Sequence, residues 1–340
     1  MNIDTPISTQ RPAAPTRRVL SGASSARWSA LDAAIWLTPA AAFFAFPNSL
    51  ALGAQIATGA LAALALDLAL GFAGIVSLGH AAFFGAGAYA AGLLATHGWT
   101  EPLTGLLAGA LVAAVFGGLA SLLMVRGKDL TRLMVSLGLC LMLHEAINKA
   151  SAITGGADGL SGIEIQPLFG LFGFDLAGRT AYIYAFVVLF VCFAFLRLLI
   201  ASPFGLSLRA IREGVNRMPS LGVNVDRRLR AAFTISAAIA GVAGALMAQT
   251  TQFVGVDAVS APRSVEFLIM LAFGGVGRLY GGLIGAAVFM FAHDVLSDLN
   301  PVYWQFWMGL LLMAVVLSGS GGLIGAVERI LQRFNLRGRA

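Results

Sequence analysis

Long apolar runs dominate this chain, and they lack the regular polar positions that mark helices or strands on a soluble surface. A helix needs about 20 apolar residues to cross a hydrocarbon layer of about 30 Å. Ten segments approach that length, and they are 29–46, 50–70, 79–96, 103–125, 130–148, 180–200, 229–249, 264–277, 281–296 and 301–317. The segment 264–277 is short and ends in glycines, as a half-helix or a re-entrant turn does. The pattern predicts an all-α polytopic membrane protein with about eight to ten transmembrane helices, some of them broken by glycine.

The composition supports this prediction. Charged residues make up 11% of the 340 residues and hydrophobic residues 58%, whereas a soluble domain carries about 25% charged residues. Such a chain has no room for a large soluble catalytic domain. Its two cysteines, Cys140 and Cys192, lie in apolar runs, so neither a structural disulfide nor a metal site is expected.

The basic residues indicate how the chain is oriented. If all ten segments cross, 19 of the 22 Lys and Arg residues fall on the side of the N-terminus, as the positive-inside rule requires of the cytoplasmic side. We therefore expect a multi-pass protein of the bacterial inner (plasma) membrane with both termini in the cytoplasm, in contact with lipid and not with nucleic acid. Residues 1–28 are expected to be a disordered cytoplasmic lead, 29–318 a transmembrane domain and 319–340 a basic cytoplasmic tail.

Motifs for catalysis are missing from the sequence. The only Gly-Lys pair, Gly127-Lys128, is followed by Asp129 and lacks the upstream glycine of a phosphate-binding loop. The four histidines have no metal-ligand spacing. We expect no enzyme activity, no catalytic residue, no metal site and no cofactor in this chain, so its function is transport, conduction or holding partners.

Asp67 is the deepest ionisable residue that we single out, in the apolar run 64–70. A charge at membrane depth is costly and usually faces a polar pathway, although a buried packing role is an equal alternative. Together with Ser77 and His80, in the glycine-rich run that follows, it is our candidate for a translocation pathway.

Two glycine clusters interrupt the apolar segments, one in each half of the chain. The first contains Gly74 and Gly79, and the second contains Gly274, Gly275 and Gly277. Small residues also serve close helix packing, but clusters in both halves favour helix breaks near a transport path.

The inner stretch 202–230 is polar and strongly basic. Leu208, Ile211 and Val215 recur at helical spacing, while the polar side carries Arg209, Arg212, Glu213 and Asn216. Gly214 weakens this helix and Pro219 ends it. The stretch is either a loop on anionic lipid or an amphipathic docking element for a cytoplasmic partner.

Six motifs in order resemble the LivM-type permeases of the branched-chain amino acid (HAAT) class of ABC importers. They are GIVSLGHAAFFGAGAY at 74–89, TGGADGL at 154–160, RAIRE at 209–213, GVAGAL at 241–246, GGVG at 274–277 and GLIG at 322–325. The likeness covers about residues 50–326. Asp67 is an exception, because such permeases more often carry an uncharged polar residue at that position.

This resemblance implies an ATP-driven importer in which the chain is one permease subunit. Its expected partners are two cytoplasmic ATPases, which use the ATP, a second permease of LivH type and a periplasmic binding protein that delivers the substrate. The stretch 204–221 resembles the coupling helix that seats in an ATPase, which makes Arg209, Arg212, Glu213 and Asn216 the coupling candidates. Branched-chain amino acids are the expected cargo. Urea, short amides or other small carboxylates are alternatives within the family, and an ion-coupled carrier or channel is the alternative of another class.

Overall fold

The computed structural model of the chain describes residues 30–47, 49–127, 129–167 and 178–317, together with residues 173, 322, 323 and 325. The lead predicted over 1–28 lies outside the described residues, as does nearly all of the tail predicted over 319–340. The described residues form twelve α-helices and no β-strand beyond one isolated bridge between Leu160 and Val254. The all-α fold predicted from the apolar runs is confirmed.

Twelve helices follow one another along the described residues. They are α1 Ala30–Ala45, α2 Leu50–Asp67, α3 His80–Thr96, α4 Pro102–Met124, α5 Asp129–Lys149, α6 Ser151–Thr154, α7 Arg179–Ala201, α8 Pro203–Glu213, α9 Val225–Thr251, α10 Ala261–Gly274, α11 Leu279–Leu299 and α12 Trp304–Leu317. A π-helical turn, η1 Leu68–Phe72, continues α2. The 3-10 turns are η2 Gly156–Asp158, η3 Val215–Arg217, η4 Pro219–Leu221 and η5 Val256–Val259.

Each of the ten predicted apolar segments coincides with one of these helices. In the described part of the chain six spans are long and apolar enough to cross a membrane, and they are Leu50–Phe72, Pro102–Met124, Leu130–Lys149, Arg179–Ala201, Val225–Thr251 and Leu279–Leu299. The other four, α1, α3, α10 and α12, have 16, 17, 14 and 14 residues, fewer than the about 20 of a full straight crossing. The segment predicted to be a half-helix or re-entrant turn is α10, which ends at Gly274.

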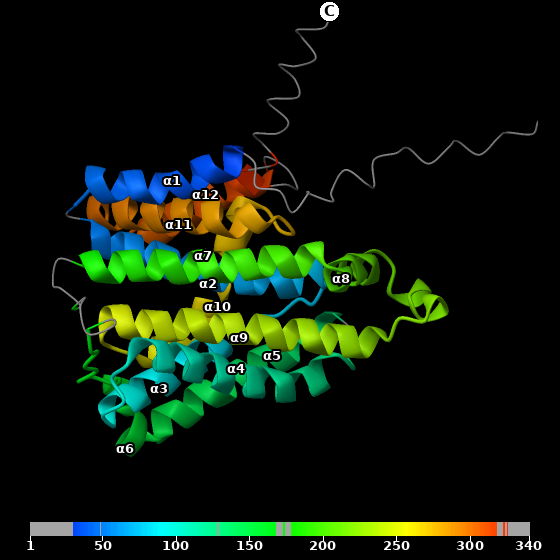
Figure 1. The fold of residues 1–340 in the computed structure, drawn as a ribbon, viewed down its shortest axis with the longest axis horizontal. Helices are drawn as coiled ribbons and strands as arrows, with labels where there is room; N and C mark the ends of the chain where they lie inside the picture. The colour runs from blue at the N-terminus through cyan, green and yellow to red at the C-terminus, as the bar shows by residue number, and fades with distance from the viewer. Residues whose placement is uncertain are drawn as a thin grey trace, which may run out of the picture.

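The helices form a bundle with α2 at its centre. In Figure 1, α1, α11 and α12 lie on one side, α3, α4 and α5 on the other, and α2, α7, α9 and α10 between them. Of the most apolar stretch of α2, 83% is buried, compared with 17% for α5. The bundle is tight where α3, α4 and α9 meet, because a Cβ on Gly87 would lie 2.2 Å from the Gly241 carbonyl oxygen. Small residues permit such close contact between membrane helices.

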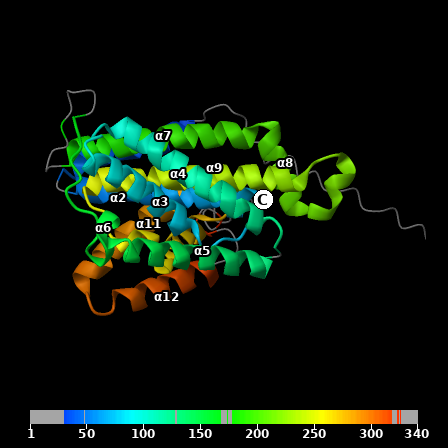
Figure 2. The same ribbon diagram turned by 90° about the horizontal axis from the view of Figure 1, so that it is seen from below.

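One end of the bundle is extended by α8 and the turns after it. In Figure 1 and in the perpendicular view of Figure 2, α8 projects beyond the neighbouring helices at one end, and α6 lies at the opposite end. We refer to the first as the α8 end. It carries the strongly basic stretch that the sequence predicts to face the cytoplasm.

Candidate functional site

The helix α8 begins and ends where its sequence dictates. Pro203 occupies the first turn, where its missing N–H costs no hydrogen bond. Gly214 follows the last residue, Glu213, with non-helical backbone angles of φ −168° and ψ 77°. The predicted stretch 204–221 therefore contains an eleven-residue helix followed by the turns η3 and η4, because Gly214 ends the helix five residues before Pro219 could.

The apolar face of α8 seats it on the bundle. Leu208 and Ile211 are both 0% exposed. The polar residues divide into two groups. The Arg209 guanidinium lies 5.3 Å from the centre of the Phe72 ring, a cation–π contact, and Arg212 donates a hydrogen bond from Nη1 to the Gly71 carbonyl. Arg212, Glu213 and Asn216 are all exposed, but of these three the structure gives only Arg212 a hydrogen bond to the bundle. Two of the four coupling candidates, Arg209 and Arg212, therefore contact the bundle.

The first interruption in the bundle, which we call the 73–79 break, separates η1 from α3. Gly74 adopts φ +71° there, a conformation that glycine takes without a Cβ penalty. Hydroxyl groups accept hydrogen bonds from the N–H groups that the break frees. Ser136 Oγ on α5 accepts from Leu78 N at 3.0 Å, and Ser77 Oγ accepts from Gly79 N at 3.2 Å. Ser264 Oγ on α10 accepts from Ala81 N at 3.0 Å.

His80 joins this break to two further helices. Its Nε2 lies 2.8 Å from Ser236 Oγ on α9, and its Nδ1 lies 3.2 Å from Ser77 Oγ. Ser236 donates its single hydroxyl proton to the Ala65 carbonyl on α2 at 2.5 Å, so it accepts from His80. The imidazole therefore carries its proton on Nε2 and accepts from Ser77 on Nδ1. The structure thus places two pathway candidates, Ser77 and His80, in one buried network of neutral groups.

The third pathway candidate, Asp67, belongs to the second interruption, between α10 and α11. We call it the 275–280 turn, which comprises residues 275–278 and the first two residues of α11. Gly275 and Gly277 have φ values of +110° and +80°. Asp67 is 1% exposed, and its Oδ1 accepts from Gly277 N at 2.7 Å. Its Oδ2 has no hydrogen-bond partner among the described residues.

Gly71 and Gly277 lie against each other beside Asp67. A Cβ on Gly71 would be 2.6 Å from Gly277 N, and a Cβ on Gly277 would be 2.8 Å from Arg212 Nη1. The candidates Asp67, Arg212 and Gly277 are thus neighbours in space, although the sequence separates them widely. Gly74 is close as well, since its added Cβ would meet Arg212 Cγ at 3.2 Å.

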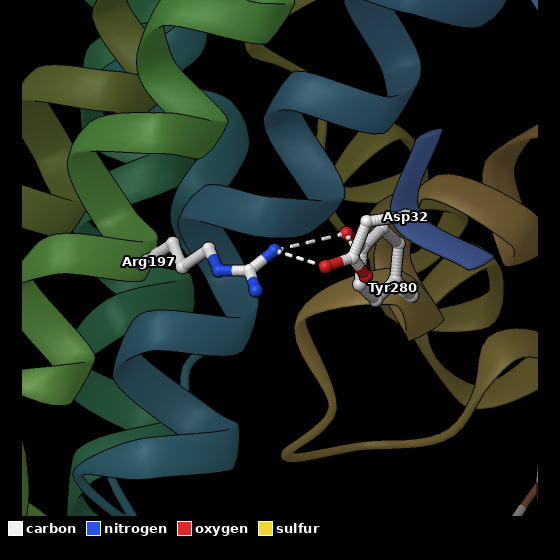
Figure 3. Close-up of polar contacts among 3 residues, drawn as sticks. All are labelled: Asp32, Arg197 and Tyr280. Carbon is white, nitrogen blue, oxygen red and sulfur yellow. Dashed lines mark hydrogen bonds and ion pairs between the residues drawn. The ribbon is translucent and has the colours of Figure 1, made fainter. Parts of the chain in front are cut away.

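A further polar cluster, which the sequence analysis missed, joins three helices at a buried position. Arg197 on α7 donates from Nη1 to Asp32 Oδ2 on α1 at 2.8 Å, and the same nitrogen lies 3.3 Å from the Tyr280 hydroxyl. Tyr280 donates that hydroxyl to Asp32 Oδ1 at 2.7 Å. Figure 3 shows the arginine reaching across from α7 to the other two side chains. The side chains of Arg197 and Asp32 are each only 11% exposed.

An apolar cavity of about 510 Å³ lies between α1, α2, α7 and α11. Trp36, Tyr182 and Phe291 contribute to its wall, and Asp294 is the one carboxylate that lines it. None of the predicted site residues lines it. The described residues hold no group of three or more His, Cys, Asp or Glu that could bind a metal ion.

Comparison with known proteins decides what kind of protein carries these features. Residues 48–316 match the family described as branched-chain amino acid transport system, permease component. The chain belongs to this family. With six long apolar spans in the part of the chain that the structure describes, this permease is a multi-pass inner-membrane protein.

Individual relatives agree with the family. The permease is 28% identical over 282 residues to the high-affinity branched-chain amino acid transport system permease protein LivM of Salmonella typhimurium, and the same holds for LivM of Escherichia coli. It covers 66% of the length of each of these, and the match takes in 77% of this chain. It is also 25% identical over 304 residues to LivH of Escherichia coli, which takes in 83% of this chain and 94% of LivH. No solved structure matches it.

Proposed function

We propose that this permease is the membrane subunit of an ATP-driven ABC importer for branched-chain amino acids. The family supports the transport role, and the relatives' names supply the cargo. ATP would be bound and hydrolysed by two partner subunits in the cytoplasm, because the sequence of this chain has no phosphate-binding loop. A second permease of LivH type would complete the membrane part, and a periplasmic binding protein would deliver the amino acid.

The observation that carries this proposal is the outward face of α8 and its following turns. Leu206, Val215 and Leu221 are 55%, 49% and 74% exposed, and they lie among the exposed polar residues Glu213 and Asn216. A short amphipathic helix that buries one face on the bundle and presents apolar side chains on the other suits a groove on a partner. The bias of basic residues supports a cytoplasmic location for this end and for both termini.

The translocation pathway would pass the two breaks in the bundle. Interrupted helices near the middle of a transporter commonly line the substrate path. Asp67, Ser77 and His80 stay our pathway candidates because each lies at one of these breaks. Binding of ATP would draw the ATPases together, displace α8 and switch the bundle between outward and inward access.

Co-purification from the native membrane in mild detergent tests this proposal. We expect mass spectrometry to find two ATPases and a second permease, and we expect the isolated complex to hydrolyse ATP. Replacing both Glu213 and Asn216 by Ala should reduce ATPase recovery while membrane insertion is unchanged. A monodisperse oligomer of this chain alone that transports solute in liposomes without ATP would instead support the carrier or channel alternative.

The cargo needs its own measurement. Leucine, isoleucine and valine should each compete for uptake by the reconstituted importer, whereas urea and short amides should not. Competition by urea or an amide alone would support an importer whose substrate is not a branched-chain amino acid.

A further inference from the structure

The 275–280 turn is contacted at two points by arginines that belong to one continuous stretch of chain. Arg212, near the end of α8, lies against Gly277 and donates to the Gly71 carbonyl. Arg197, near the end of α7, lies 3.3 Å from the Tyr280 hydroxyl. Only Ser202 separates α7 from α8, so both arginines move with the same pair of helices.

Each point is anchored by a buried carboxylate from another helix. Asp67 on α2 accepts from Gly277 N at 2.7 Å, and Asp32 on α1 accepts from Tyr280 at 2.7 Å. Charged hydrogen bonds in a low-dielectric interior are strong and have narrow geometry. Because Arg197 and Asp32 are each only 11% exposed, a displacement of Arg197 cannot be absorbed by solvent and must be followed by the groups that it contacts. Arg212 is itself exposed, and it reaches the bundle through the hydrogen bond from Nη1 to the Gly71 carbonyl, beside the buried Asp67.

The conformation of the 275–280 turn is consistent with movement. Gly275 and Gly277 occupy positive φ angles, and the turn lies between α10 and α11, which pack against each other. The turn also contacts η1, where the π-helical geometry of α2 ends at Gly71 and Phe72. Irregular helical turns of this kind often accompany functional sites.

We propose that Arg197 and Arg212 are positioning residues that transmit movement of the α7–α8 pair to the 275–280 turn, with Asp32 and Asp67 as their anchors. This inference rests on the proposed function, because α8 is taken as the element that the ATPases move. Under this proposal, Arg197 and Arg212 contact the bundle, whereas Glu213 and Asn216 would contact the ATPase. Arg212 thus connects α8 to the bundle.

The transport test uses the assembled importer in liposomes and measures both ATP hydrolysis and uptake. In Arg212→Gln and Tyr280→Phe we expect ATPase recovery as in the unaltered protein and uptake per ATP lowered by about tenfold. Arg212→Lys, which keeps a donor for the Gly71 carbonyl, should recover part of the uptake. Arg126→Gln is the matched control, because Arg126 is an exposed arginine in the turn between α4 and α5. Unchanged uptake per ATP in both variants, or loss of the ATPases from Arg212→Gln, would overturn the inference.

Hydrogen exchange on the purified permease alone separates this inference from the proposed function. Peptides covering residues 272–282 should exchange about tenfold faster in Arg212→Gln and in Tyr280→Phe than in Arg126→Gln. Unchanged exchange in both variants would exclude a connection between the two arginines and the 275–280 turn, whatever partners the chain has. Faster exchange in a protein that recovers no ATPase would support the connection between the arginines and the turn, and would contradict the proposal that the chain is an importer subunit.

Discussion

The two breaks inside the bundle are stabilised by different chemistry. At the 73–79 break, serine hydroxyls accept from the freed backbone N–H groups, and the neutral imidazole of His80 links Ser77 to Ser236. At the 275–280 turn, the carboxylates of Asp67 and Asp32 and the guanidinium groups of Arg212 and Arg197 surround the chain. Neutral hydrogen bonds between packed helices hold the 73–79 break in place. The charged groups on α7 and α8 can transmit a displacement of these two helices to the 275–280 turn. The comparison indicates a fixed break and a movable one.

Removing the imidazole should have the largest effect on stability. His80→Ala leaves the buried Ser77 hydroxyl without its acceptor and opens a cavity, and we expect it to lower the free energy of unfolding by about 3 kcal/mol. The loss should be visible as a lower midpoint of thermal unfolding in detergent. His97→Ala, in the exposed residue just after the other end of α3, serves as the control and should leave the midpoint nearly unchanged. Equal midpoints for both variants would show that the 73–79 break does not depend on this network.

Gly277→Ala should have the next largest effect, because it strains the movable break in two ways. The residue has φ +80°, and its new Cβ would lie 2.8 Å from Arg212 Nη1. We expect a loss of about 2 kcal/mol. Gly222→Ala isolates the backbone part of this cost, since Gly222 has φ +77° and no atom within 4 Å of an added Cβ. If the two variants unfold at the same midpoint, crowding by Arg212 contributes nothing.

Single serine replacements should have the smallest effect. Ser264→Ala removes the acceptor of Ala81 N–H at a position that is 1% exposed, which should cost about 1 kcal/mol. Ser220→Ala, at an exposed residue in η4, is the control. A graded series of midpoints, with Ser264→Ala between the control and His80→Ala, would support the fixed character of the 73–79 break. A Ser264→Ala midpoint equal to the control would show that this hydrogen bond is replaceable.

The length of the apolar runs and the positions of the glycines predicted much of this arrangement. The ten apolar segments coincide with helices because burial in lipid leaves the backbone few alternatives. The chain leaves its helices at Gly74 and around Gly275 and Gly277, where the sequence places its glycine clusters. The limits of α8 were less well predicted, since Gly214 ended the helix before Pro219.

The partners of the site residues could not be predicted locally. Asp67 was a visible candidate, but its hydrogen-bond donor is the backbone of Gly277, 210 residues away. Ser136, Ser236 and Ser264 are single hydroxyls in apolar helices, and nothing in their neighbourhood distinguishes them from packing residues. Asp32 and Arg197 did give a signal, because both are ionisable residues in or beside apolar segments. Arg197 was counted only as a cytoplasmic charge.

The first helix has a consequence for how this permease relates to its family. The shared region begins at residue 48, yet α1 ends before it and supplies both Asp32 and part of the wall of the 510 Å³ cavity. A shortened chain that begins at residue 48 would lack the Asp32 carboxylate to which Arg197 donates and the α1 wall of the cavity. In this permease, residues ahead of the shared region therefore complete both a buried ion pair and one wall of the cavity.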